Sequence, residues 1–202
     1  MSVENITAEA ETFTCNAYFV LDGTPTLVDA GSMPSVTDVL SSYSTPVDRV
    51  VITHQHGDHI EQLEAIVDAH DPAVHAYADH PLRTHAIDDG DLVTIGTDTY
   101  EAVHTPGHAD DHLAFVSDTT VFTGDVVVHN DGAFDYGSFG RTDMPGQSRE
   151  ELIKSIRRLL DRLPEGVEHM YAGHGDEFHG DVRDVIETAL ERAEKREPKY
   201  PE

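Results

Sequence analysis

Three histidines and one aspartate follow one another closely in the stretch VVITHQHGDH. In an extended segment, residues two apart project to the same side, so His54 and His56 can bind one ion. If a helix begins near Asp58, the chain turns there, and Gly57 permits the bend. Asp58 and His59 then point away from the first pair, toward a neighbouring ion. Neutral imidazole and carboxylate ligands suit Zn(II), Mn(II) or Fe(II), so the stretch predicts a metal site.

Three further polar clusters follow apolar runs. The run YEAVHTPG leads to His108, TVFTG leads to Asp125, and HMYAG leads to His174. Loops at strand ends are where a rigid scaffold presents functional side chains. Five histidines and two carboxylates can therefore converge from four separate strands. The alternative is a solvated His-rich loop, against which the fixed spacing of the first cluster argues.

The elements that must position these residues alternate between strands and helices. Apolar runs separated by turn signals predict strands at Thr12–Leu21, Thr26–Asp29, Arg49–Thr53, Val74–Tyr77, Leu92–Ile95, Tyr100–His104, Leu113–Val116, Thr120–Thr123 and Glu168–Tyr171. Two batches of strands with helices outside them predict an α+β fold, in which helix layers cover a pair of sheets. The absence of repeats and low-complexity linkers favours a single domain over residues 1–202.

Apolar stripes predict three helices. The first follows the histidine cluster, with Leu63 and Ile66 on its buried face. The second opens at Ser148, with Glu151 three residues later as a capping-box pair, and Pro164 stops it. The third spans about residues 181–195. These stripes indicate packing faces rather than cofactor sites.

The charge of the chain is unusual. There are 39 Asp and Glu residues against 13 Lys and Arg residues, which gives a formal charge of −26. Such a surface repels nucleic acid and anionic membranes, and it strains the folded state unless salt screens it. Because the acidic residues are spread along the whole chain, we expect a salt-adapted protein from a halophile; a merely acidic surface is the alternative.

The single cysteine, Cys15, excludes an internal disulfide and a four-cysteine zinc site, and its apolar surroundings predict a buried residue. No signal-peptide pattern or membrane-spanning run is visible. We therefore expect a cytoplasmic protein that acts on a small-molecule substrate and has no membrane partner.

The order of the motifs is specific. The pattern H-x-H-x-D-H, followed by HTPGH, TGD and GHG, resembles the metallo-β-lactamase superfamily, as do NAYFV and TLVDAG. The resemblance covers roughly Cys15 to His174. It implies an αββα sandwich of two mixed β-sheets flanked by helices, with a binuclear metal site in a cleft at one edge.

The resemblance also implies which residues bind the metals. All seven ligand positions of the family are filled: the first metal would be bound by His54, His56 and His108, the second by Asp58, His59 and His174, with Asp125 bridging them. The cofactor implied is a pair of divalent ions, Zn(II) before Fe or Mn. A metal-bridging hydroxide would attack the substrate, with Asp58 as the catalytic residue that orients it and takes its proton.

The segment GSFGRTDMPGQSREELIKSIRRL is similar to part of the glyoxalase II group, the hydroxyacylglutathione hydrolases, which cleave thioesters. It is also similar to the persulfide dioxygenases, which bind one iron. Where the eukaryotic-type glyoxalases offer a lysine and a tyrosine to glutathione, this chain has Arg141 and Asp143. Arg141 can bind a substrate carboxylate, or it can pair with Asp143.

Two departures from the glyoxalase pattern bear on the substrate. The longer helical substrate domain of the eukaryotic glyoxalases is expected to be absent. The stretch ADDHLAF, which contains His112, replaces a Pro-Gly-Ser turn and resembles some lactamase-like endoribonucleases. The chain has no basic stripe to hold phosphates, which argues against that alternative.

Overall fold

The structure is a computed structural model that describes residues 2–196. The chain divides into two compact units, Met1–Tyr100 and Glu101–Glu202. This division does not test the prediction of a single domain over residues 1–202, which stays a prediction. Two mixed β-sheets flanked by helices are present, and this part of the fold prediction is confirmed.

The first sheet is built from strands of the first unit. Its order is β1-β2-β3-β4-β5-β6, antiparallel from β1 to β3 and parallel from β3 to β6. The strands are β1 (Val3–Asn5), β2 (Tyr18–Val20), β3 (Thr26–Val28), β4 (Arg49–Val51), β5 (Ala73–Ala76) and β6 (His85–Ala86). Because β3 and β4 are parallel neighbours, the residues that follow them emerge at the same edge of the sheet.

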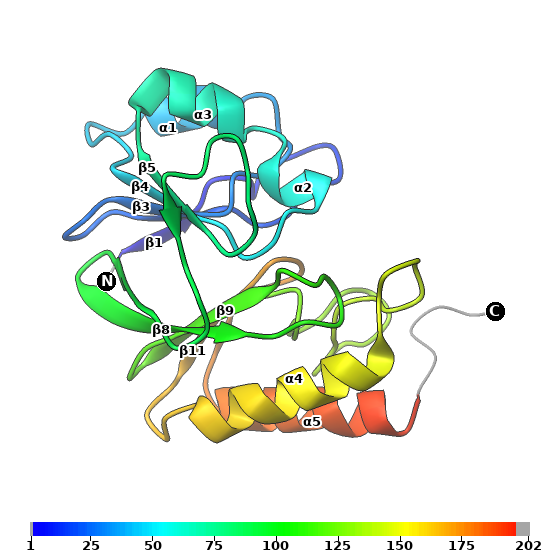
Figure 1. Ribbon diagram of the computed structural model, residues 1–202. Helices are drawn as coiled ribbons and strands as arrows, with labels where there is room; N and C mark the ends of the chain where they lie inside the picture. The colour runs from blue at the N-terminus through cyan, green and yellow to red at the C-terminus, as the bar shows by residue number, and fades with distance from the viewer. Residues whose placement is uncertain (1, 197–202) are drawn as a thin grey trace. The chain divides into compact units, whose positions relative to one another are not determined.

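Three helices accompany this sheet: α1 (Val36–Ser41), α2 (Gly57–Ile60) and α3 (Leu63–His70). The helices α1 and α3 lie side by side over one face of it (Figure 1). Register places Phe19, Leu27, Val50 and Val74 opposite one another across four strands, and all four are fully buried. This apolar row belongs to the same core cluster as the buried residues of α1 and α3, so it fixes the strand that precedes the histidine cluster.

The second sheet has the order β12-β11-β10-β9-β8-β7. Its strands are β7 (Leu92–Ile95), β8 (Asp98–His104), β9 (Leu113–Val116), β10 (Thr120–Gly124), β11 (His169–Ala172) and β12 (Phe178–His179). The strands β10 and β11 are parallel, whereas β9 is antiparallel to both β8 and β10. The strands β8, β10 and β11 therefore point the same way, and their carboxyl ends share one edge.

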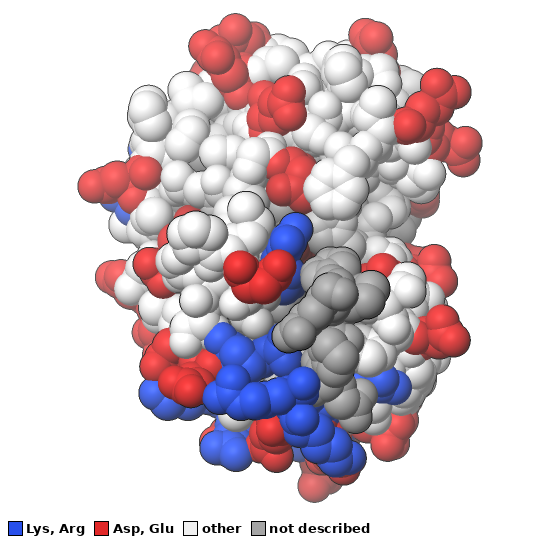
Figure 2. All heavy atoms as spheres, turned by 90° about the vertical axis from the view of Figure 1, so that its right-hand side faces the viewer, with Lys and Arg blue, Asp and Glu red and all other residues white. Residues whose placement is uncertain are grey.

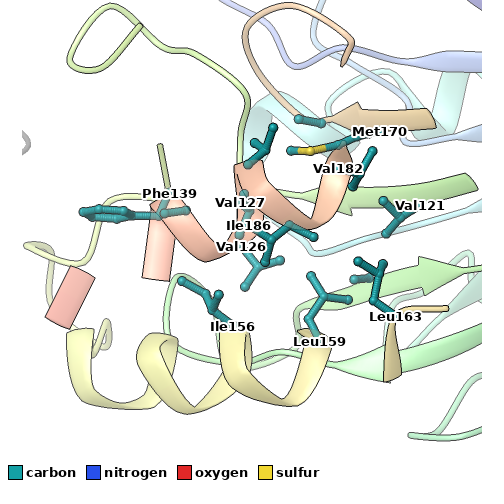
Figure 3. Packing of buried hydrophobic residues seen from close by; sticks show 14 of the residues in the cluster. Val121, Val126, Val127, Phe139, Ile156, Leu159, Leu163, Met170, Val182 and Ile186 are labelled. Atoms are coloured by element: carbon teal, nitrogen blue, oxygen red, sulfur yellow. The ribbon is translucent and has the colours of Figure 1, made fainter. Parts of the chain in front are cut away.

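Two long helices, α4 (Arg149–Arg162) and α5 (Val182–Glu194), pack against each other in the second unit (Figure 1). Figure 3 shows Ile156, Leu159 and Ile186 pointing into a core that includes Val121 and Met170 of the sheet. The Ser148 hydroxyl accepts a hydrogen bond from the Glu151 backbone N–H, so the serine half of the predicted capping box is confirmed. The other half is absent, because the Ser148 N–H donates to Gly107 O instead of to the Glu151 side chain. The third predicted helix is confirmed as α5.

The predicted strand Thr12–Leu21 was wrong in extent, because only Tyr18–Val20 is a strand. The residues before it are held by single hydrogen bonds, from both backbone and side chains, instead of a strand ladder. The Thr7 hydroxyl bonds both Cys15 O and Ala17 N. Cys15 itself is fully buried, as predicted. Four short elements, β1, β6, β12 and α1, were not predicted at all.

The helix predicted after the histidine cluster is interrupted between α2 and α3. The Gln62 N–H donates to Gly31 O, and Asp58 O accepts from the Cys15 N–H. These two tertiary bonds replace the helical bond that would otherwise join Gln62 to Asp58. Because α2 is therefore only one turn long, Asp58 and His59 are held by their contacts with neighbouring segments.

Charge is distributed unevenly between the two units. The first unit contains only two basic residues, Arg49 and Arg83, although acidic residues occur throughout it. All other Lys and Arg residues belong to the second unit, and Figure 2 shows many of them gathered on one face. Ion pairs between Arg157 and Glu194 and between Arg196 and Glu150 join α4 to the end of α5. Among residues 2–196, no helix is long and apolar enough to cross a membrane.

Candidate metal centre

The first unit carries four of the predicted ligands immediately after β4. His54 is buried, and its Nε2 lies 3.0 Å from Nδ1 of His56. His56 has an extended backbone and precedes α2, which begins at Gly57, so the predicted bend is present. Two imidazole nitrogens at this separation can share one ion.

Asp29, which follows β3, organises this cluster. Its Oδ1 accepts a hydrogen bond from the Thr53 N–H, and its Oδ2 accepts bonds from the Thr53 hydroxyl and from Nδ1 of His59, at 2.8–2.9 Å. Asp29 is buried and has φ 61°, a left-handed conformation that aspartate tolerates better than most residues. The sequence motif TLVDAG contained this aspartate, but its role was not predicted.

The hydrogen bonds assign the ring protons of two histidines. The Asp29 carboxylate can only accept, so His59 carries its proton on Nδ1 and presents Nε2 as the ligand atom. The Thr53 hydroxyl gives its proton to Asp29 and therefore accepts from Nδ1 of His54, 3.1 Å away. His54 likewise presents Nε2. One buried carboxylate thus orients both rings.

Asp58 lies in α2 beside His59. Its Oδ2 is 3.9 Å from Nε2 of His59, and its side chain is 20% exposed. The backbone holds it in place, since Asp58 O accepts from the Cys15 N–H and His59 O accepts from the Ala30 N–H. The carboxylate of Asp58 therefore faces the same side as the ligand nitrogen of His59 and keeps access to solvent.

Another buried group of potential ligands lies nearby, but it does not resemble a metal site. Cys15, Asp29 and His59 have potential ligand atoms within 4.8 Å of one another. However, burial raises the pKa of the Cys15 thiol to about 11, which keeps it protonated at neutral pH. The carboxylate of Asp29 is already occupied by Thr53 and His59. We assign this group to support of His59.

The second unit brings the other three predicted ligands together. His108 follows β8, Asp125 follows β10 and His174 follows β11, at the shared edge of that sheet. Asp125 Oδ2 lies 3.3 Å from Nε2 of His108 and 3.5 Å from Nε2 of His174. One carboxylate oxygen is thus flanked by two imidazole nitrogens, and a bridging role between two ions stays a prediction.

The backbone at Gly140 and Arg141 orients His108. Arg141 O accepts a hydrogen bond from Nδ1 of His108 at 2.9 Å, so Nε2 is the ligand atom. A Cβ on Gly140 would lie 2.1 Å from Asp125 O and 2.8 Å from the same ring nitrogen. No side chain fits there. The sequence analysis did not single out Gly140, although this glycine directly precedes Arg141, a candidate site residue.

The side chain of Arg141 pairs with Asp143. Its Nε and Nη2 donate to the two carboxylate oxygens at 3.0 and 2.9 Å, and both side chains are exposed. Of the two roles considered for Arg141, the ion pair is present in the structure. Binding of a substrate carboxylate stays a prediction, and it requires exchange with Asp143.

His112 is a positioning residue and is fully buried. Its Nε2 accepts a hydrogen bond from the Asp125 N–H at 2.9 Å, so its proton lies on Nδ1, which donates to the Thr105 hydroxyl at 2.8 Å. One ring nitrogen therefore holds the backbone of a predicted ligand, and the other anchors the ring to Thr105.

Replacing His112 by leucine is expected to weaken metal binding by about 10- to 100-fold, because the Asp125 N–H loses its acceptor. His112→Gln should restore much of the loss, since its amide oxygen can accept that bond. Metal titration against a chromogenic chelator measures both. Equal losses in the two variants would show that His112 contributes packing alone.

The donor set of both clusters fits divalent metal ions. Each cluster offers imidazole nitrogens and a carboxylate, and His54, His59 and His108 have their second ring nitrogen bonded to an oxygen that fixes the ligand atom. His104, which is not a predicted ligand, bonds Asp110 O through Nε2 instead.

Known proteins resemble the chain in both sequence and fold. The hydroxyacylglutathione hydrolase of Hydrogenovibrio crunogenus is 29% identical over 153 residues, which cover 73% of this chain and 52% of that protein. The hydroxyacylglutathione hydrolase of Vibrio cholerae is 30% identical over 152 residues, or 73% and 56% of the two chains. The chain thus spans about half the length of these relatives.

Two solved structures extend the comparison. ETHE1 from Myxococcus xanthus superimposes with a TM-score of 0.77 at 21% identity, covering 100% of this chain and 92% of that one, and it bears on the fold alone. TTHA1623 in a di-iron-bound form gives a TM-score of 0.67 at 26% identity, covering 88% of this chain and 91% of that one.

The family to which the chain belongs follows from a sequence model. The sequence model of the metallo-beta-lactamase superfamily matches residues 10–199. With nearly its whole length matched, the chain belongs to the metallo-beta-lactamase superfamily.

Proposed function

We propose that this protein is a metal-dependent hydrolase that cleaves a small thioester or a related acyl compound, as the glyoxalase II group does. The observation that carries the proposal is the fixed orientation of the donor atoms in both clusters, which prepares them for metal before substrate arrives. The similarity to hydroxyacylglutathione hydrolases supports the thioester. Because only about half of those relatives is matched, substrate and thiol belong to the proposal.

The proposed centre combines the ligands of the two units, as family membership suggests. The sets are His54, His56 and His108 for one ion, Asp58, His59 and His174 for the other, and Asp125 between them. We propose Zn(II) as the metal, and the relative with a di-iron-bound form makes iron the alternative. Metal analysis of the purified protein decides between them.

In the proposed reaction, the metal ions, Asp58 and Arg141 have different roles. A bound metal pair would supply a hydroxide nucleophile near neutral pH and polarise the acyl carbonyl. Asp58, which is partly exposed beside His59, accepts the proton released on attack. Arg141 binds a carboxylate of the substrate, which replaces Asp143 as the partner of the guanidinium group. No nucleophilic serine or cysteine is required.

A substrate screen tests the proposal. Protein loaded with Zn(II) or Fe(II) in high-salt buffer is mixed with thioesters and with matched oxygen esters, and release of thiol or acid is followed. We expect turnover of thioesters and two metals per chain. Absence of turnover under every metal condition would overturn the proposal, while one iron per chain with oxygen uptake would identify a persulfide dioxygenase.

We also propose a salt-adapted, cytoplasmic protein. In dilute buffer we expect loss of the helical circular-dichroism signal and its recovery in molar KCl, because salt screens the repulsion among the acidic residues. The first unit, with Arg49 and Arg83 as its only basic residues, should lose structure first. Full folding at low salt would contradict the adaptation.

A further inference from the structure

Two exposed histidines face each other across the last strand pair of the second unit. His169 of β11 and His179 of β12 are directly opposite in the antiparallel register. The neighbouring pair is joined by a hydrogen bond from the Gly180 N–H to Glu168 O. Opposite residues alternate between hydrogen-bonded and non-hydrogen-bonded pairs, so the two histidines occupy a non-hydrogen-bonded position, where side chains come closest.

The ring nitrogens of this pair converge. Nδ1 of His169 lies 2.8 Å from Nδ1 of His179, with ring centroids 5.0 Å apart and planes at 71°. The His54–His56 pair of the candidate metal centre has nearly the same geometry, with nitrogens 3.0 Å apart, centroids 4.5 Å apart and planes at 77°. The exposed pair therefore brings two imidazole nitrogens as close together as the proposed ligands His54 and His56, although it does so through Nδ1 of both rings.

A third histidine pair, on two parallel strands, has a different ring geometry. His75 and His85 are also opposite each other on neighbouring strands, β5 and β6. Their rings are stacked face to face, with planes at 6° and centroids 4.5 Å apart. Stacked rings direct their nitrogen lone pairs side by side instead of toward one point, so this pair serves as an internal comparison.

The surroundings of His179 prepare it to bind a cation. Glu177 Oε1 lies 3.6 Å from Nε2 of His179. A carboxylate at this position favours the proton on Nε2 and leaves the lone pair on Nδ1, which is the arrangement that carboxylates give to metal-binding histidines. His169 then donates its Nδ1 proton to His179. When an ion takes the place of that proton, the proton moves to solvent or to Nε2 of His169.

The two imidazole ligands indicate the class of ion, and their separation allows it. Two metal–nitrogen bonds of about 2.0–2.1 Å place their nitrogens about 2.9 Å apart at a right angle and about 3.3 Å apart at a tetrahedral angle. The observed 2.8 Å is a hydrogen-bond separation close to both values, so the two nitrogens can reach one ion with little movement. Imidazole ligands suit Cu(II) and Ni(II), and Cu(II) binds most tightly among divalent first-row ions.

We propose that His169 and His179 form a second metal site, which binds Cu(II) or Ni(II) with water in the remaining positions. The site is distinct from the candidate metal centre, because the pair lies at the start of β11 and His174 follows its end. The strand is about 10 Å long. An ion there would join β12, a strand of two residues, to β11.

Copper titration of the metal-loaded protein tests the site. We expect the wild-type protein to bind one more equivalent of Cu(II) than the variants His169→Gln and His179→Gln, and its additional electron paramagnetic resonance signal to show two nitrogen ligands. The variant His85→Gln, which alters the stacked pair, should match the wild type. Circular dichroism and the hydrolytic rate are measured alongside, and both substitutions at the site should leave them unchanged.

The opposite results would overturn the proposal. If the wild type and His179→Gln bind the same number of copper ions with the same spectra, the pair is only hydrogen-bonded. If His85→Gln loses an equivalent as well, copper binds surface imidazoles without selection. Because neither histidine belongs to the proposed hydrolytic centre, failure here leaves the proposed function intact.

Discussion

Replacing Asp58 by asparagine is expected to lower kcat for the proposed thioester hydrolysis by about 10²- to 10⁴-fold, the usual effect of removing a general base. Asparagine keeps the size of the side chain but cannot accept the proton. The fold should survive, because the neighbouring segment holds Asp58 through its backbone carbonyl, which accepts from the Cys15 N–H. The carboxylate itself is partly exposed.

Steady-state kinetics and metal analysis measured together separate the two roles of Asp58. A loss of rate with both metals retained assigns proton transfer, whereas a loss of one metal assigns ligation. Glu61→Gln is the matched control, since Glu61 ends the same short helix and is exposed. If Asp58→Asn retains the full rate, Asp58 has no part in the reaction. If Glu61→Gln is equally slow, the effect is electrostatic.

Replacing Asp29 by alanine is expected to lower the free energy of unfolding by at least about 3 kcal/mol, because each buried donor that is left without an acceptor costs about 1–3 kcal/mol. Three buried donors lose their acceptor: the Thr53 N–H, the Thr53 hydroxyl and Nδ1 of His59. His59 also loses the contact that fixes its ring proton, and the Thr53 hydroxyl that orients His54 loses its own acceptor. We therefore expect reduced metal binding in addition to reduced stability.

Urea unfolding of the metal-depleted protein measures the first effect without contribution from metal. The matched control is Asp71→Ala, because Asp71 also has a left-handed backbone, with φ 50°, but ends α3 in an exposed position. Its substitution isolates the cost of placing alanine in that conformation. Equal losses at both positions would show that backbone strain, and not the buried hydrogen bonds, explains the result at Asp29.

Local patterns in the sequence predicted the long elements well. The apolar stripe of α4 and its Ser148 cap depend on residues within a few turns of one another, and both are present as expected. Short elements were missed because their stability comes from distant partners. The break between α2 and α3 arises from Gly31 and Cys15, which bond the backbone of Gln62 and Asp58 in place of helical bonds.

The candidate site divides in the same way. The spacing of His54, His56, Asp58 and His59 indicated a metal-binding cluster, because ligand chemistry is visible in residue types. The residues that orient the predicted ligands were not predictable from their local sequence. His112, which accepts a hydrogen bond from the Asp125 N–H, lies 13 positions before Asp125, and Asp29 lies 30 positions before His59.

Chemical labelling of the buried Cys15 thiol can report local opening of the first unit. With its pKa raised to about 11 and its side chain inaccessible, the thiol resists oxidation and alkylation while the first unit stays closed. Its N–H donates to Asp58 O, so opening of this segment releases the short helix α2, which carries Asp58. The rate of thiol labelling therefore measures how often this segment opens, and a bound metal that holds α2 in place would slow the labelling.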